Sequence, residues 1–320
     1  MKVVEVSEFG GPQVLRIIEK PTPSPAEGTL LIEVKAAGVN YSDVMARSGF
    51  YPQIPRAPFA LGFEVAGVVK AVGPGVDGFK EGDPVAAIVL SGGGYATHVV
   101  VPAQIAIPLP PGLDFALATG VLVQGLTAYM LIEEARVKEG DAILISAAAG
   151  GVGSIAVQIA KTRGAKVIGL ASRSKFELLT RLGADHAVDY DDTGWSLSVR
   201  DAVGDHGLQV YLDSIGDLTT GAFPLLSHFG QWIIFGVRSA SGNPLPPEAT
   251  YAMIEKNITL RGFNLEGSLQ HVPRALGDLF KWIAEGSLKV EVTKYALDEA
   301  ADVHKRFEGR KTTGKVVLIP

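Results

Sequence analysis

The stretch Ala147-Ala148-Ala149-Gly150-Gly151-Val152-Gly153 decides the fold of this chain. It follows the apolar run 142–145 and precedes the helix-like run 154–160, so the order is strand, glycine-rich turn, helix. Such a turn lets the backbone approach a pyrophosphate, and the helix N-terminus offers free N–H groups and a positive dipole end. We therefore predict a nucleotide site at Ala149, Gly150, Gly151 and Val152.

Two other interpretations of this stretch stay open at this point. The strict G-x-G-x-x-G fingerprint is not met, because Ala147 replaces the first glycine and lies three residues before Gly150, so an ordinary tight connection is the first alternative. The uncharged run 142–160 is also a membrane-span candidate by length, although glycines, serines and a glutamine interrupt it. A second strand-like run at 165–170 closes a βαβ unit of about 30 residues, which favours the nucleotide site.

Composition narrows the class of protein. The 320 residues are 47% hydrophobic and 20% charged, which predicts a globular chain with a large core and about two domains. The net charge of -5 and the absence of a basic run argue against a nucleic-acid partner. Without cysteine there can be no disulfide, thiolate metal ligand or cysteine nucleophile. The N-terminal residues alternate like a strand and lack a signal-peptide core, so we expect a cytoplasmic protein with no membrane partner.

The chain changes character at about residue 115. Before it, short strand-like runs between Gly/Pro turns predict a compact, barrel-like β-rich domain; these runs are 2–6, 30–36, 64–72, 84–89 and 95–101. After it, a helix at 117–135 and alternating strands and helices predict a doubly wound α/β domain, with strands near Ile143, Val167, Ala187, Val210, Trp232 and Ile258. The final run 315–319 is expected to be a strand that returns to the N-terminal domain. The predicted fold class is therefore α/β.

Six stretches, in order along nearly the whole chain, resemble one family. They are 37–43 (AGVNYSD), 58–67 (PFALGFEVAG), 124–129 (QGLTAY), 147–153, 182–185 (LGAD) and 314–317 (GKVV). The chain resembles the zinc-free quinone oxidoreductases of the medium-chain dehydrogenase/reductases, which are related to zeta-crystallin. The resemblance implies a GroES-like catalytic domain at 1–120, completed by about 270–320, and a Rossmann domain at 121–269. It also implies NAD(P)H-dependent reduction at a site between the two domains.

A metal site is not expected. Zinc-dependent members of this family use a cysteine where Asn40 stands and a histidine where Phe63 stands. Catalytic zinc needs about three N, S or O ligands, and neither residue type is suited to that task. The six histidines are scattered, without an H-x-x-x-H pair.

The end of the second Rossmann strand predicts NADPH as the cofactor. NAD sites place Asp or Glu there for the ribose 2′-hydroxyl, whereas this chain has Ser172, Arg173 and Lys175. A 2′-phosphate is a dianion that Arg and Lys can bind and to which a serine hydroxyl can donate. By resemblance, Lys175 and Tyr190 match positions that contact this phosphate. An ordinary solvated basic turn is the alternative.

The resemblance also assigns the reacting end of the site. It places Thr127 and Phe235-Gly236-Val237 against the nicotinamide, and Asn40 and Asp43 on a turn that faces the cofactor. Tyr51 is a candidate to hydrogen-bond a substrate carbonyl as negative charge develops, and Tyr41 is a second candidate. The alternatives are local turn capping for Asn40 and Asp43 and aromatic packing for the tyrosines.

These residues favour the reduction of a quinone or another α,β-unsaturated carbonyl by hydride transfer. No residue stands out as a general acid, which suits quinones because their reduced oxygens can take protons from solvent. One alternative is an NADPH-dependent alkenal or enoyl reductase, and another is a non-catalytic NADPH-binding protein with a structural or sensing role. By resemblance, the run 257–262 is an outer strand that pairs across a two-fold axis, so we expect a homodimer.

Overall fold

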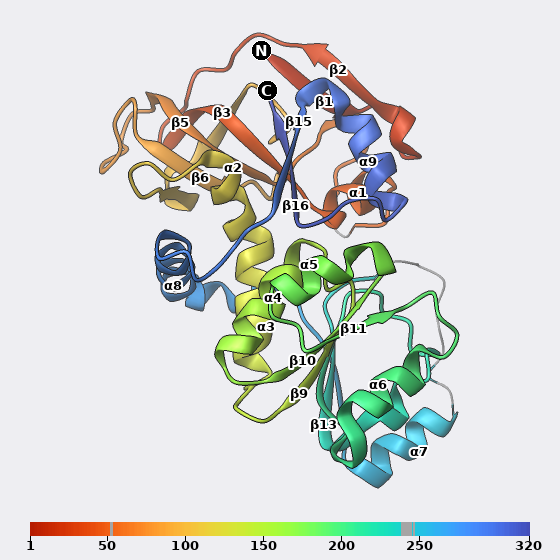
Figure 1. The fold of residues 1–320 in the computed structure, drawn as a ribbon. Helices are drawn as coiled ribbons and strands as arrows, with labels where there is room; N and C mark the ends of the chain where they lie inside the picture. Colours follow the sequence, from red (N-terminus) through yellow and green to blue (C-terminus); the bar gives the residue numbers. More distant parts are fainter. Residues whose placement is uncertain (52–53, 238–244, 246) are drawn as a thin grey trace. The chain divides into compact units, whose positions relative to one another are not determined.

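The protein consists of two compact units, shown in Figure 1. The computed structural model describes residues 1–51, 54–237, 245 and 247–320. Unit 1 comprises residues 1–124 and 290–320, and unit 2 comprises residues 125–289. The chain therefore leaves the first unit, forms the second, and returns to the first, as the final strand-like run predicted.

Unit 1 is built on a sheet around one long strand, β3, in which every strand pair is antiparallel except the parallel pair of β15 and β16. The sheet has seven strands in the order β15-β16-β3-β5-β6-β8, and β7 also pairs with β3. The C-terminal strand β16 lies antiparallel to β3, with Val316 opposite Val39 and Leu318 opposite Ala37. The strands are β3 (Thr29–Val39), β5 (Glu64–Val72), β6 (Pro84–Ile88), β7 (His98–Pro102), β8 (Ala106–Pro108), β15 (Val292–Ala296) and β16 (Lys315–Ile319).

A second, three-stranded sheet completes unit 1, in the order β2-β1-β4. The strand β1 (Lys2–Val6) matches its expected range. The strands β2 (Leu15–Glu19) and β4 (Phe59–Ala60) were not expected, because β2 does not alternate between apolar and polar residues and β4 has only two residues. The strand expected at 95–101 begins only at His98, since the Tyr95 N–H donates to the Leu61 carbonyl in a loop. The helices of this unit are α1 (Tyr41–Arg47), α2 (Phe115–Thr119) and α9 (Ala300–Glu308).

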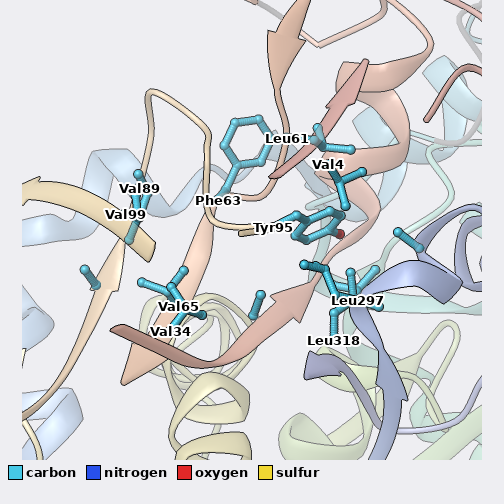
Figure 2. Close-up of a cluster of buried hydrophobic side chains, with 14 of the residues drawn as sticks. Val4, Val34, Leu61, Phe63, Val65, Val89, Tyr95, Val99, Leu297 and Leu318 are labelled. Carbon is cyan, nitrogen blue, oxygen red and sulfur yellow. The ribbon is translucent and has the colours of Figure 1, made fainter. Parts of the chain in front are cut away.

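The core of unit 1 joins segments from both ends of the chain. Figure 2 shows Tyr95 among Val4, Leu61 and Leu297, with Leu318 of β16 close by. All five side chains are buried. Because burying one large apolar side chain is worth about 1.5–3 kcal/mol, the return of residues 290–320 is a substantial part of this unit's stability.

Unit 2 is a parallel six-stranded sheet in the order β11-β10-β9-β12-β13-β14. This is the doubly wound order: from β9 the chain adds β10 and β11 on one side, then crosses over and adds β12, β13 and β14 on the other side. Figure 1 shows α4 and α7 on opposite sides of the sheet. The strands are β9 (Ala142–Ile145), β10 (Lys166–Ala171), β11 (His186–Asp189), β12 (Leu208–Asp213), β13 (Leu226–Ile234) and β14 (Thr259–Gly262). The main helices are α3 (Leu126–Glu134), α4 (Gly151–Thr162), α5 (Phe176–Arg181), α6 (Trp195–Val203), α7 (Pro247–Lys256) and α8 (Val272–Ala284). The predicted α/β class is confirmed.

The helix expected at 117–135 is interrupted. The chain forms α2, then a π-helix at Gly120–Gly125, then α3. Among the described residues, Phe115–Glu134 is the one run long and apolar enough to cross a membrane, and 78% of its most apolar window is buried inside the protein. That is the pattern of a core helix. The run 142–160, which raised the same question in the sequence, is instead strand β9, the glycine turn and most of α4.

The division into units falls at 124/125 and 289/290, whereas the expected domain limits were 120/121 and 269/270. The second limit differs by about one helix. Helix α8 belongs to unit 2, where it contacts α3, and the Tyr129 ring stacks on Trp282 at 5.9 Å between centroids.

Candidate functional site

The turn between β9 and α4 is shaped to bind an anion. The Gly150 N–H donates to the Ala147 carbonyl at 2.8 Å, and Ala147 has a positive φ of 45°. A Cβ on Gly153 would lie 2.4 Å from the Ala147 oxygen, so only glycine lets the helix start this close to the turn. Within the part of the chain that the structure describes, no side chain caps α4. Its first N–H groups, at Gly151 and Val152, therefore point out of the helix at the positive end of the dipole, as pyrophosphate binding requires.

The end of β10 carries a basic turn. A short 3-10 helix at Arg173–Lys175 follows Ser172, and the Arg173 side chain is 76% exposed. The Lys175 side chain is about half-buried, and burial lowers its pKa. No carboxylate stands at the end of β10 itself. The end of β10 therefore offers cations that suit a phosphate and no carboxylate of its own for a ribose hydroxyl.

The remaining cofactor candidates of unit 2 are the run 235–237, Thr127 and Tyr190. The Phe235 N–H donates to the Asp213 carbonyl at 2.8 Å, which fixes the start of the run 235–237 beside β12, and Val237 is exposed. Thr127 is buried near the start of α3, and Tyr190 directly follows β11. The structure thus brings 149–152, 172–175, 190 and 235–237 to the carboxyl ends of neighbouring strands, where Rossmann domains bind their ligands.

No role was predicted for Asp213 from the sequence. It is buried at the end of β12, where its side chain accepts from the Ile215 N–H at 2.8 Å and from Trp232 Nε1 at 3.1 Å. Burial raises the pKa of the Asp213 carboxyl. The Ser146 hydroxyl lies 2.9 Å from the Ser214 hydroxyl and joins β9 to β12. An acidic residue at the end of an apolar run is the signal that could have indicated this network.

In unit 1, Asn40 is held by a buried charged network. Its Nδ2 donates to Glu64 Oε2 at 2.9 Å, and its Oδ1 accepts from Lys315 Nζ and Gln124 Nε2, both at 3.1 Å. Lys315 and Glu64 form an ion pair with both side chains 0% exposed. Glu64 Oε1 also accepts the Val123 N–H, inside the π-helix, at 2.9 Å. The Asn40 amide therefore has a single defined orientation.

Glu64, Gln124 and Lys315 lie in stretches that carry the family resemblance, but no role was predicted for them. Glu64 stands at the start of an otherwise apolar run, and Lys315 begins the strand KVVLI. A charge beside buried strand residues is the signal, because a buried charge requires a partner.

Asp43 caps its own helix. Its Oδ2 accepts the Asn40 N–H at 2.7 Å in a capping box at the start of α1, and the side chain is fully buried. Burial raises the pKa of the Asp43 carboxyl to about 7. The alternative of local capping thus describes the Asp43 geometry, and its catalytic role stays a prediction.

Tyr51 packs against an aromatic ring, and Tyr41 lies at the start of a helix. The Tyr51 ring stacks on Phe63 with centroids 5.7 Å apart and an interplanar angle of 29°. Tyr41 is the first residue of α1 and is half-buried. Aromatic packing is therefore present for Tyr51, and its catalytic assignment stays a prediction.

Among the described residues, no group of three or more His, Cys, Asp or Glu side chains could hold a metal ion. Phe63 and Asn40 occupy the positions at which zinc ligands were considered, and the Asn40 amide is engaged by Glu64, Gln124 and Lys315.

Comparison with known families and proteins identifies the family of the chain. Residues 26–111 match the alcohol dehydrogenase GroES-like domain, and residues 151–283 match the zinc-binding dehydrogenase domain. A quinone oxidoreductase of Salmonella typhimurium is 34% identical over 326 residues, covering 99% of each chain. The human synaptic vesicle membrane protein VAT-1 homolog is 30% identical, and the match covers 100% of this chain and 86% of the human protein.

The fold is also that of a solved relative. The Escherichia coli quinone oxidoreductase complexed with NADPH is similar with a TM-score of 0.92 and 33% identity, covering 100% of both chains. The domain matches, the full-length identity and the shared fold agree with one another. The chain therefore belongs to the quinone oxidoreductase family of the medium-chain dehydrogenase/reductases.

Proposed function

We propose that this protein is an NADPH-dependent quinone oxidoreductase that reduces quinones or related α,β-unsaturated carbonyls without zinc. The observation that carries the proposal is the combination of an uncapped α4 N-terminus with a basic turn, and no carboxylate, at the end of β10. The solved Escherichia coli relative is complexed with NADPH, which supports the same cofactor here.

The pyrophosphate, the 2′-phosphate and the nicotinamide of the cofactor each have candidate partners in unit 2. The N–H groups of Gly151 and Val152, with Ala149 and Gly150 in the preceding turn, would bind the pyrophosphate. Arg173 and Lys175, with Ser172 and Tyr190, would bind the 2′-phosphate. Thr127 and the run 235–237 would lie along the nicotinamide.

When bound, NADPH supplies a hydride, and a proton from solvent completes the reduction of a quinone to a hydroquinone. The residues proposed to act on the substrate are Asn40, Asp43 and Tyr51. An amide nitrogen carries two hydrogens, and the bond to Glu64 uses one Asn40 Nδ2 hydrogen, so the second is the donor that Asn40 would offer to a substrate oxygen. The Tyr51 hydroxyl would stabilise developing negative charge on that oxygen.

Binding measurements test the cofactor assignment. Isothermal titration calorimetry should show that NADPH binds much more tightly than NADH. The variant R173A should weaken NADPH binding about tenfold or more, because a hydrogen bond to a charged group is worth about 1.5–3 kcal/mol, and should leave NADH binding nearly unchanged. Equal affinities of the unaltered protein for the two cofactors would refute the assignment.

A substrate panel tests the reaction. NADPH consumption should be measured with 1,4-benzoquinone, an alkenal and an enoyl thioester at matched concentrations, with elemental analysis of zinc on the same preparation. Turnover of the quinone without stoichiometric zinc supports the proposal. Turnover of the alkenal or enoyl thioester alone would identify a C=C reductase, and binding without any turnover would indicate a structural or sensing protein.

We also propose that the protein is a cytoplasmic homodimer. In the described part of the sheet, β14 (Thr259–Gly262) is an outer strand that pairs with β13 on one side. An outer strand has unpaired backbone groups that a second copy can pair with. Light scattering should give the mass of two chains, and the mass of one chain would refute the dimer.

A further inference from the structure

A carboxylate stands beside the basic turn, on the neighbouring strand. Strands β10 and β11 are parallel, and their last residues Ala171 and Asp189 are paired in register. Neighbouring strands are about 4.8 Å apart, so the Asp189 side chain leaves the sheet beside the point where β10 continues into Ser172 and Arg173. The basic turn thus has an acidic neighbour that the sequence of β10 does not contain.

Asp189 is fixed in place and holds Arg173. One of its oxygens, Oδ1, accepts the Asp191 N–H at 3.0 Å, and the other, Oδ2, accepts Arg173 Nε at 3.1 Å. The Asp189 side chain is 17% exposed, whereas the Arg173 side chain is 76% exposed. A long, exposed arginine otherwise samples many rotamers, so this bond limits where its guanidinium lies.

The atom of Arg173 that Asp189 contacts shows whether the carboxylate orients the arginine or competes with a phosphate for it. A two-pronged pair uses two N–H groups of an arginine at once. Asp189 Oδ2 accepts from one of them, Nε, so the Nη1 and Nη2 hydrogens at the end of the guanidinium can still be donated to a phosphate. Asp192 lies 4.0 Å from Nη2, which is too long for a hydrogen bond.

We propose that Asp189 is a positioning residue, which holds Arg173 so that the end of its guanidinium meets the 2′-phosphate of NADPH. This rests on the proposed function, in which Arg173 binds that phosphate. Asp189 would act through Arg173 and would set the preference for NADPH over NADH.

The test is the dissociation constant of each cofactor, measured by calorimetry. Because holding one flexible side chain is worth about 0.5–1.5 kcal/mol, D189A should weaken NADPH binding about three- to tenfold and leave NADH binding within about twofold. D189N should lose less, since its amide oxygen can still accept from Nε. D192N is the matched control: it removes a nearby charge that makes no hydrogen bond to Arg173, and its amide oxygen can still accept the Gly194 N–H, so it should not weaken NADPH binding.

A further variant keeps the hydrogen bond to the Asp191 N–H while it removes the contact with Arg173. D189S removes the carboxylate from Arg173 but keeps a short hydroxyl acceptor for the Asp191 N–H. It should show the same loss of NADPH affinity as D189A, while unchanged NADH affinity and circular dichroism report an intact fold. Unchanged NADPH affinity in the folded variants would overturn the proposal, and tighter NADPH binding in D189A and D189N would show that Asp189 competes with the phosphate.

The double variant R173A/D189A separates this inference from the proposed function. If Asp189 acts through Arg173, D189A should cause no further loss when Arg173 is absent. An equal loss in that background would overturn the positioning role alone. If R173A itself leaves the NADPH-to-NADH preference unchanged, the assignment of the phosphate site is what fails.

Discussion

Removing Lys315 should destabilise unit 1 strongly. The variant K315M leaves the Glu64 carboxylate buried without its cation, and breaking a buried pair in this way costs about 3–5 kcal/mol. Glu64 keeps two donors, Asn40 Nδ2 at 2.9 Å and the Val123 N–H at 2.9 Å, which places the expected loss near the lower end. A loss of about 3 kcal/mol corresponds to a fall in melting temperature of roughly 6–12 °C for a unit of this size. Guanidinium denaturation followed by circular dichroism measures it.

Two further variants test whether the loss of stability comes from the buried, unpaired charge. The matched control is K20M in the same unit, where Lys20 Nζ lies 2.8 Å from Glu5 and the lysine side chain is 46% exposed. An exposed pair of this kind is worth about 0.2–1 kcal/mol. The double variant E64Q/K315M removes both charges and should recover at least half of the K315M loss. If K315M costs no more than K20M, or if E64Q/K315M is as unstable as K315M, the reasoning about the buried charge is wrong.

Two further predictions concern stability. Because burial raises the pKa of Asp43 to about 7 from an ordinary 3.8, the folded state binds the proton more tightly than the unfolded state. The stability from this proton is complete below about pH 3.8 and is lost as the pH rises through 7. The side chain introduced by D43N stays neutral at every pH, so the free energy of unfolding of D43N relative to that of the unaltered protein should rise by roughly 2–3 kcal/mol between pH 5 and pH 8, in parallel urea titrations. A constant difference across that range would contradict the assignment. In unit 2, G153A should lower the free energy of unfolding by about 1–3 kcal/mol and weaken NADPH binding, because the added Cβ would lie 2.4 Å from the Ala147 oxygen. The control G277A, in α8 with no atom within 4 Å of the added Cβ, should be neutral or stabilising, and equal losses in both variants would refute the steric argument.

The sequence by itself determined the class of fold and which residues stand at the carboxyl edge of the parallel sheet. Parallel strands buried on both faces are read as continuous apolar runs, and a glycine turn before a helix is a local feature that needs no distant partner. The residues at the ends of β9 and β10 follow their strands directly, so their place at the carboxyl edge of the sheet follows from strand direction alone. The strand β2 was missed because its residues do not alternate between apolar and polar, and the π-helix Gly120–Gly125 was missed because the apolar sequence continues through it.

Only the tertiary structure decided how distant charges are paired. Lys315 and Glu64 are 251 residues apart, and they meet because β16 returns to pair with β3 beside β5. Arg173 and Asp189 meet because β10 and β11 end in register. A charged residue shows in the sequence that it needs a partner or solvent, but which partner it finds depends on strand order and register, which are long-range properties of the folded chain.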